Sequence, residues 1–157
     1  TATGPAPSDP AVRGLIKLAA VCLLAGCAAQ GGTNVGLTDD GRLPPCPSSP
    51  NCVSSDADDE AHRIAPLAVT GDPAAAWRRL VDHVQADPAY TIVAQTERYL
   101  HAEARTRLLR FVDDVEFHLR PADGEIAMRS ASRLGYSDLG ANRRRLERLR
   151  AALAEAP

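Results

Sequence analysis

The sequence predicts an α+β domain in which a four-stranded antiparallel sheet packs against two helices, in the order α-β-β-β-β-α, behind an extended N-terminal arm. Three observations predict this fold class. Apolar residues follow a helical spacing in two segments, one in the middle of the chain and one at its end. Four segments of strand character lie between them. Each predicted helix has a single apolar stripe, so one face of a sheet can cover both helices.

The first predicted helix begins at Asp72, a good N-cap residue, with Pro73 at the first helical position. Its apolar face starts at Trp77 and continues with a leucine and two valines at helical spacing. Asp87 and Pro88 end the helix, because the residue before a proline disfavours helical backbone angles. Trp77 is therefore predicted to lie in the core.

Four strands follow the helix. Residues 91–96 and 99–105 are predicted to form a hairpin, and a longer strand covers residues 108–120. The sequence Pro-Ala-Asp-Gly at 121–124 has turn character, and the last strand covers residues 125–132. A four-residue loop pairs Arg120 with Glu125, which fixes the register of the third and fourth strands.

That register places Glu116 opposite Arg129, Phe117 opposite Met128 and Leu119 opposite Ile126. One face is then apolar and consists of Phe111, Val115, Phe117, Leu119, Ile126 and Met128. Further along, the same face continues with Asp113, Ser130 and Ser132. The apolar face is thus predicted to turn polar at one end, unless a bulge at Asp113 and Asp114 resets the alternation.

The last predicted helix begins near Asp138, which is a good cap. Its stripe is Leu139, Asn142, Leu146, Leu149 and Leu153, so an asparagine stands where a core leucine is expected. Five arginines are expected mostly on its outer, solvated face: Arg143, Arg144, Arg145, Arg148 and Arg150.

The N-terminal part has the features of a lipoprotein leader. A basic stretch, a short apolar run and small residues precede Cys27. The four residues that end at Cys27, Leu-Ala-Gly-Cys, resemble the lipobox of bacterial lipoproteins. The apolar run is too short to span a bilayer, which needs about 20 residues. We therefore expect a signal peptide at 1–26 and diacylglycerol on Cys27. A plain secretory signal and a fortuitous alanine-rich stretch are the alternatives.

Small residues after Cys27 predict a lipidated flexible tether at 27–42, followed by one globular domain at 43–157. The expected location is the cell envelope, on a membrane facing the periplasm. Alanine directly after the lipid-bearing cysteine favours the outer membrane over the inner one. Acidic residues at 56–60 are expected to form a solvated turn, because they lack the spacing of a calcium loop.

Cys46 and Cys52 are the two cysteines that remain after the anchor, in a proline-rich segment. In an oxidising compartment their spacing favours a disulfide. A redox pair is usually Cys-x-x-Cys at a helix start, and a zinc site needs further ligands in spacing, so both are weaker alternatives. No metal or other cofactor is predicted.

Composition excludes one class of partner. The net charge is −2 and only 4% of the residues are aromatic, so neither a basic surface nor a stacking platform for nucleic acid is indicated. The expected partners are the membrane, through the lipid on Cys27, and an envelope protein.

Three long motifs resemble the protein family defined by domain of unknown function 1499. They are the segments at 43–55 (LPPCPSSPNCVSS), 110–117 (RFVDDVEF) and 129–143 (RSASRLGYSDLGANR). The resemblance covers about residues 43–153 without a clear departure. It implies an envelope or membrane-associated protein, often a lipoprotein. The family has no established activity, so it assigns no catalytic residue to this chain.

The motifs contain a dense polar set that the predicted register brings largely to one end of the sheet. Its members are Arg110, Asp113, Asp114, Glu116, Arg129, Ser130, Ser132, Arg133, Asp138, Asn142 and Arg143. They are interpreted first as a buried network that joins strand to helix. The alternatives are a pocket in which arginines hold an anionic or sugar-like ligand, and an acid–base pair of carboxylates. Asp113 and Asp114 point to opposite faces of a strand, which argues against such a pair.

The sequence thus predicts a lipid-anchored envelope protein with a non-catalytic binding or assembly module. A small-ligand binder, a hydrolase-like enzyme that uses the Arg/Asp cluster, and a module that holds lipid between helices and sheet are the alternatives. No nucleophile elbow, phosphate loop or zinc motif is present in the sequence.

Overall fold

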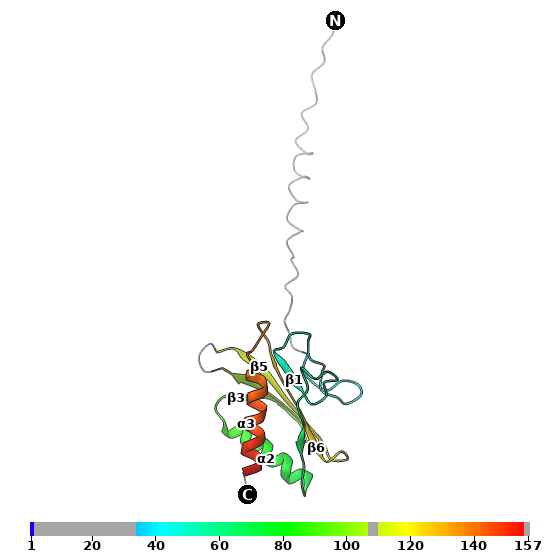
Figure 1. Cartoon of the computed structure of the whole chain (residues 1–157), viewed down its shortest axis with the longest axis vertical. Coiled ribbons are helices and arrows are strands. Elements are labelled where there is room, and N and C mark those ends of the chain that lie inside the picture. The colour runs from blue at the N-terminus through cyan, green and yellow to red at the C-terminus, as the bar shows by residue number, and fades with distance from the viewer. Residues whose placement is uncertain (2–33, 107–109, 156–157) are drawn as a thin grey trace. The chain divides into compact units, whose positions relative to one another are not determined.

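A computed structural model describes Thr1, residues 34–106 and residues 110–155, and in it an antiparallel sheet packs against two helices (Figure 1). The elements in chain order are β1 (Cys52–Ser54), β2 (Leu67–Ala68), α2 (Pro73–Ala86), β3 (Tyr90–Gln95), β4 (Tyr99–Arg105), β5 (Val112–Arg120), β6 (Glu125–Ser132) and α3 (Ala141–Glu155). Neither α2 nor α3 is long and apolar enough to cross a bilayer. The predicted signal peptide, apart from Thr1, and Cys27 lie outside the described residues.

The sheet has six strands, where the sequence predicted four. Its order is β1-β6-β5-β4-β3, and β2 also pairs with β6. The four predicted strands correspond to β3–β6. The two additional strands come from the arm, and they pair antiparallel with β6 along the side that β5 leaves open. They were missed because three and two residues are too few to show an alternating pattern, and because distant pairing partners form them.

The predicted register of the hairpin formed by β5 and β6 is confirmed. Arg120 lies opposite Glu125, Glu116 opposite Arg129, and the pairing continues without a bulge to Asp113 and Ser132. The helix-facing side of the sheet therefore does change from apolar to polar toward one end. Because no bulge resets the alternation, Asp113 and Asp114 lie on opposite faces.

Two predictions at the start of β5 need correction. The strand begins at Val112, not at residue 108, and Phe111 is 47% exposed and outside the core. Arg110 has a left-handed backbone (φ 52°), and the amide of Thr106 donates to the carbonyl of Phe111. Arg110 and Phe111, which were predicted in the strand, therefore lie before its first residue. Residues 107–109 lie outside the described residues.

Helix α2 and the sheet form the apolar core as predicted. Asp72 caps the helix by accepting hydrogen bonds from the amides of Ala74 and Ala75. The side chains of Trp77, Leu80, Val81 and Val84 are buried. They pack in one cluster with residues of β4, β5, β6 and α3. Both helices cover the same face of the sheet (Figure 1).

Helix α3 begins at Ala141, three residues later than predicted. Asp138 still acts as a cap, because its carboxylate accepts from the amides of Gly140 and Asn142. Leu139, predicted in the apolar stripe, is instead 84% exposed. Its left-handed backbone (φ 53°) directs the chain out of the helix before the first turn. Leu146 and Leu149 are buried as the stripe predicts.

Candidate functional site

The predicted polar set divides into two networks, one on each face of the sheet. Asp113, Ser130 and Ser132 share the face that α3 covers, whereas Asp114, Glu116 and Arg129 lie on the opposite face. Alternation along β5 and β6 causes the division, since neighbouring residues of a strand point to opposite sides. Both networks lie at the same end of the sheet, as predicted, but the backbone of the sheet separates them.

On the helix side, Arg145 of α3 connects the helix to both strands. Its guanidinium forms an ion pair with Asp113 of β5, and its Nη1 donates to Ser130 Oγ of β6 over 2.9 Å. All three residues are buried. The prediction that Arg145 lies on the outer face of the helix is therefore wrong. It lies inward because it follows Asn142 by three positions, and this spacing places the two side chains on one side of the helix.

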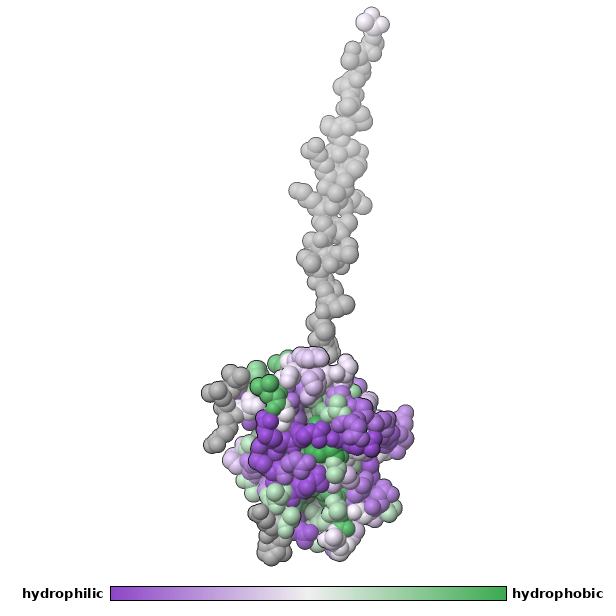
Figure 2. Space-filling view, viewed as in Figure 1, coloured by the Kyte–Doolittle hydropathy of each residue, from purple (hydrophilic) through white to green (hydrophobic). Residues whose placement is uncertain are grey.

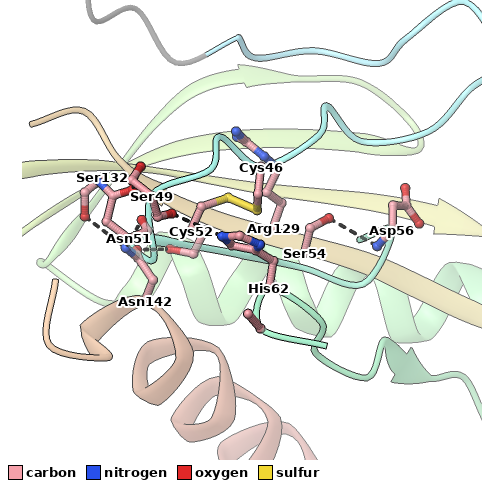
Figure 3. Close-up of a disulfide and its surroundings, with 12 residues drawn as sticks. Cys46, Ser49, Asn51, Cys52, Ser54, Asp56, His62, Arg129, Ser132 and Asn142 are labelled. Carbon is pink, nitrogen blue, oxygen red and sulfur yellow. Dashed lines mark hydrogen bonds between the residues drawn. A yellow bond between two sulfur atoms is a disulfide. The ribbon is translucent and has the colours of Figure 1, made fainter. Parts of the chain in front are cut away.

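Asn142 joins three segments of the chain and is fully buried. Its Oδ1 accepts from Ser130 Oγ over 2.6 Å, and its Nδ2 donates to Ser132 Oγ and to the carbonyl of Asn51, both over 2.9 Å. Figure 3 shows the amide between Ser132 and Asn51. A leucine could make none of these bonds, so the asparagine in an otherwise apolar stripe satisfies buried polar groups.

On the opposite face, Glu116 is at the centre of the second network. It is 0% exposed, and its Oε2 accepts from Arg129 Nη1 over 2.7 Å, with Arg129 only 1% exposed. Glu116 Oε1 accepts from Tyr99 OH and from the amide of Gly36, each over 2.7 Å. Burial and the hydrogen bond to Glu116 raise the pKa of Tyr99, so its hydroxyl stays protonated. Gly36 shows that the arm is attached to the sheet upstream of residue 43.

Asp114 extends this network toward the sheet end. It hydrogen-bonds to His101 Nε2 over 2.8 Å and pairs with Arg133, whose Nη2 lies 2.7 Å from its Oδ1. Arg133 also pairs with Glu103 over 2.8 Å. The hydrogen bond to Asp114 is the main reason why the pKa of Arg133 is raised.

On the second face of the sheet, a disulfide closes a loop within the arm, and an ion pair attaches the arm to β5. Cys46 and Cys52 are bonded, which confirms the predicted disulfide, and Figure 3 shows Arg129 beside it. Asp56 accepts from both terminal nitrogens of Arg120, at 2.8 and 2.5 Å. The prediction of a solvated acidic turn is thus wrong for Asp56. Burial raises the pKa of Asp56. The hydrogen bonds from Arg120 and from the amide of Leu43, together with the charges of Arg120 and Arg42, outweigh burial and hold this pKa below its ordinary value.

Three residues of the predicted set do not join either network. Arg110 is exposed, and its side chain bonds to no other described residue. Arg143 donates to the carbonyls of Arg63 and Ala61. Asp138 caps α3. Sequence reasoning missed Arg145, Tyr99, His101, Glu103 and Asn51. The i,i+3 spacing to Asn142 could have indicated Arg145, and strand alternation could have paired His101 with Asp114 once β4 was placed beside β5.

Two of the cavities at the polar end of the sheet border the networks. The arginine-lined cavity, of about 400 Å³, is bordered by Arg129, Arg133, Asn51 and the disulfide segment. Among the described residues, Arg129 Nε is a buried nitrogen without a hydrogen-bond partner. The apolar pocket, of about 320 Å³, lies around the start of β5 and the loop before α3. In the described part of the chain, no cluster of three or more histidine, cysteine or acidic residues could hold a metal ion.

A family described as protein of unknown function (DUF1499) matches residues 42–153, which include both networks except Gly36. The chain belongs to the DUF1499 family. No curated protein and no solved structure matches it significantly. The DUF1499 match thus confirms the resemblance carried by the three motifs, and the motif residues are largely those that build the two networks.

Proposed function

We propose that this DUF1499 protein is a lipid-anchored envelope protein whose domain is a non-catalytic binding or assembly module. One observation carries the proposal for the domain. Each carboxylate of the two networks is already paired with an arginine of the same domain: Asp113 with Arg145, Asp114 and Glu103 with Arg133, and Glu116 with Arg129.

Such pairing argues against acid–base catalysis. A general acid or base must reach a substrate and exchange a proton with it. Asp113, Asp114 and Glu116 are buried, and protonating any of them would leave an arginine without its partner in a region of low dielectric. Their arrangement instead resembles a framework that fixes α3 and the arm to the sheet. Such a framework supports a surface that must keep its shape to bind a partner.

A variant that keeps the shape of the side chain can distinguish a binding module from a hydrolase. Asp113→Asn keeps an oxygen to accept from Arg145 but cannot act as a base. We expect the full chain with Asp113→Asn to melt at a lower temperature, and to keep any phenotype that the wild-type gene complements in a deletion strain. A hydrolytic activity of the wild-type protein that this variant loses, while its circular dichroism is unchanged, would contradict the proposal.

The anchor is supported by the lipobox-like stretch before Cys27 and by the disulfide, which is typical of an oxidising compartment. We place the protein on a membrane facing the periplasm, the outer more than the inner one. Cys27→Ala should abolish labelling by a palmitate analogue and release the protein from the membrane fraction. The matched control is Cys22→Ala, which should leave both unchanged. Persistent acyl labelling in Cys27→Ala would refute the anchor.

A small-ligand binder is the second candidate, and the unpartnered Nε of buried Arg129 favours it. The arginine-lined cavity next to it could take a carboxylate or phosphate oxygen, since guanidinium groups bind both. Inorganic phosphate and acetate are suitable probes. Ligand that binds the folded state raises the melting temperature with concentration. A rise for wild type that Arg133→Gln loses would support this candidate over a purely structural network.

A further inference from the structure

An exposed apolar rim surrounds the apolar pocket. Phe111, Leu134, Tyr136 and Leu139 are 47, 70, 75 and 84% exposed, and three of them line the pocket directly. They come from two loops, one before β5 and one between β6 and α3. Scattered apolar residues are common on protein surfaces, but a cluster around a pocket indicates an interaction site. We call these four residues the apolar rim.

Local hydrogen bonds hold the rim in its outward conformation. Leu139 adopts a left-handed backbone, which is unfavourable for a branched side chain. Its amide donates to Ser137 Oγ over 3.2 Å, and its carbonyl accepts from Arg144 Nη1 over 2.8 Å. The Asp138 carboxylate accepts from the next amide, that of Gly140. These bonds fix the loop with the leucine directed away from the core.

The rim lies at the end of the domain at which the described part of the arm begins. Asn34 and Gly135 both border the arginine-lined cavity, and Gly135 also borders the apolar pocket. Figure 1 likewise shows the cyan start of the arm and the orange loop before α3 at the same end of the domain. Cys27 precedes Asn34 by seven positions. A chain of that length spans at most about 25 Å when fully extended, so lipid on Cys27 would keep this end near the bilayer.

The charges at this end suit an anionic lipid surface. Arg110 is exposed beside Phe111, and Arg144 is exposed beside Leu139. The acidic groups nearby are already engaged, Asp113 by Arg145 and Asp138 by the cap of α3. Hydrophobic surface is visible at the same end in Figure 2. Exposed apolar residues with a tyrosine and flanking arginines are typical of segments that insert at a membrane interface.

We propose that the apolar rim docks onto the surface of the membrane that carries the lipid anchor, with its leucines and Tyr136 among the lipid headgroups. This inference rests on the proposed anchor at Cys27. The domain would then stand on the bilayer at its tether end. The turn between β5 and β6, at the far end of the same hairpin, would face away from the membrane.

Tryptophan fluorescence of the full, lipidated chain tests this orientation. Tyr136→Trp places a reporter in the rim, and Ala122→Trp places a matched reporter in the exposed β5–β6 turn. The eight residue pairs of this hairpin separate the two positions by about 25 Å. Both variants keep Trp77, which is buried in the core and contributes the same background. The vesicles contain phosphatidylethanolamine and phosphatidylglycerol with brominated acyl chains, which quench nearby tryptophan.

We expect quenching and a blue shift for Tyr136→Trp and neither for Ala122→Trp. Adding Leu134→Ser and Leu139→Ser should remove the quenching of Tyr136→Trp. Both leucines are exposed, so the melting temperature should stay unchanged. Equal quenching of the two reporters, or none in either, would overturn the proposed docking. So would an unquenched rim that crosslinks to an envelope protein in cells, which would make it a protein interface.

The outcome is separable from failure of the anchor. Acyl labelling and flotation of the same preparation with vesicles report whether Cys27 carries lipid. If the protein floats and Tyr136→Trp is unquenched, the docking is wrong and the anchor remains. If the wild-type chain is not acylated, the proposed anchor is wrong, and the docking inference falls with it.

Discussion

Arg129→Met should be strongly destabilising, although it replaces a charged residue by an apolar one of similar length. The arginine is 1% exposed and its partner Glu116 is 0% exposed. Removing one member of a buried ion pair costs about 3–5 kcal/mol, because the other charge stays buried without compensation. The loss of stability therefore measures the cost of burying Glu116 without its partner. It does not measure the net contribution of the ion pair to stability.

Two features of the structure reduce this cost. Glu116 keeps the hydrogen bonds from Tyr99 OH and from the amide of Gly36. The substitution also removes the unpartnered Nε of Arg129, and an unsatisfied buried donor costs about 1 kcal/mol or more. We therefore expect a loss of about 2–4 kcal/mol in the free energy of unfolding. For a domain of this size that lowers the melting temperature by about 8–16 °C.

The assay is urea unfolding of wild type, both single variants and the double variant at neutral pH. Glu116→Gln is the matched change, because its amide oxygen can still accept from Tyr99 and Gly36. Arg129→Met combined with Glu116→Gln should be more stable than Arg129→Met alone, with a coupling of about 1–2 kcal/mol. A single variant that loses less than about 1 kcal/mol, or effects that simply add, would refute the assignment of a buried, uncompensated charge.

Two further predictions concern the arm. Replacing Cys46 and Cys52 by serine should lower the free energy of unfolding by about 2 kcal/mol, because the closed loop is short. Reductant should then shift the melting temperature of wild type only; a shift in both proteins would count against the assignment. Asp56 has a lowered pKa, so its stabilisation is present above pH of about 4 and is lost as pH falls through the folded-state pKa. Asp56→Asn should reduce the loss of stability at acid pH, whereas Asp58→Asn, at an exposed position, should not. The measurement is the melting temperature between pH 2 and 7, a range around the ordinary pKa of about 4. If the melting temperature of Asp56→Asn depends on pH as that of the wild type does, the role of Arg120 is contradicted.

Local sequence patterns were sufficient for much of the fold. The cap at Asp72 and the spacing after Trp77 predicted α2, and the four-residue turn after Arg120 fixed the register of β5 and β6. These features depend on interactions between residues close in the chain. The same register correctly predicted that the helix-facing side turns polar at Asp113. It also paired Glu116 with Arg129.

Several assignments depended on residues far apart in sequence. The arm supplies β1 and β2 only because β6 offers them backbone partners, and no local pattern marks such short strands. Arg145 is buried where an exposed side chain was expected, and Leu139 is exposed where a buried one was expected. Arg145 is buried because it pairs with the buried Asp113 of β5, and Leu139 is exposed because its left-handed backbone before α3 directs it outward.

The sequence by itself determined the family, the pairing of the central hairpin, the disulfide candidates and the composition of the polar cluster. Only the tertiary structure decided which arginine neutralises which carboxylate, and that the cluster is two networks separated by the sheet. The physical reason is that alternation assigns a residue to a face, whereas partners on that face come from α3, β4 and the arm. Those partners meet only after the chain has folded around the sheet.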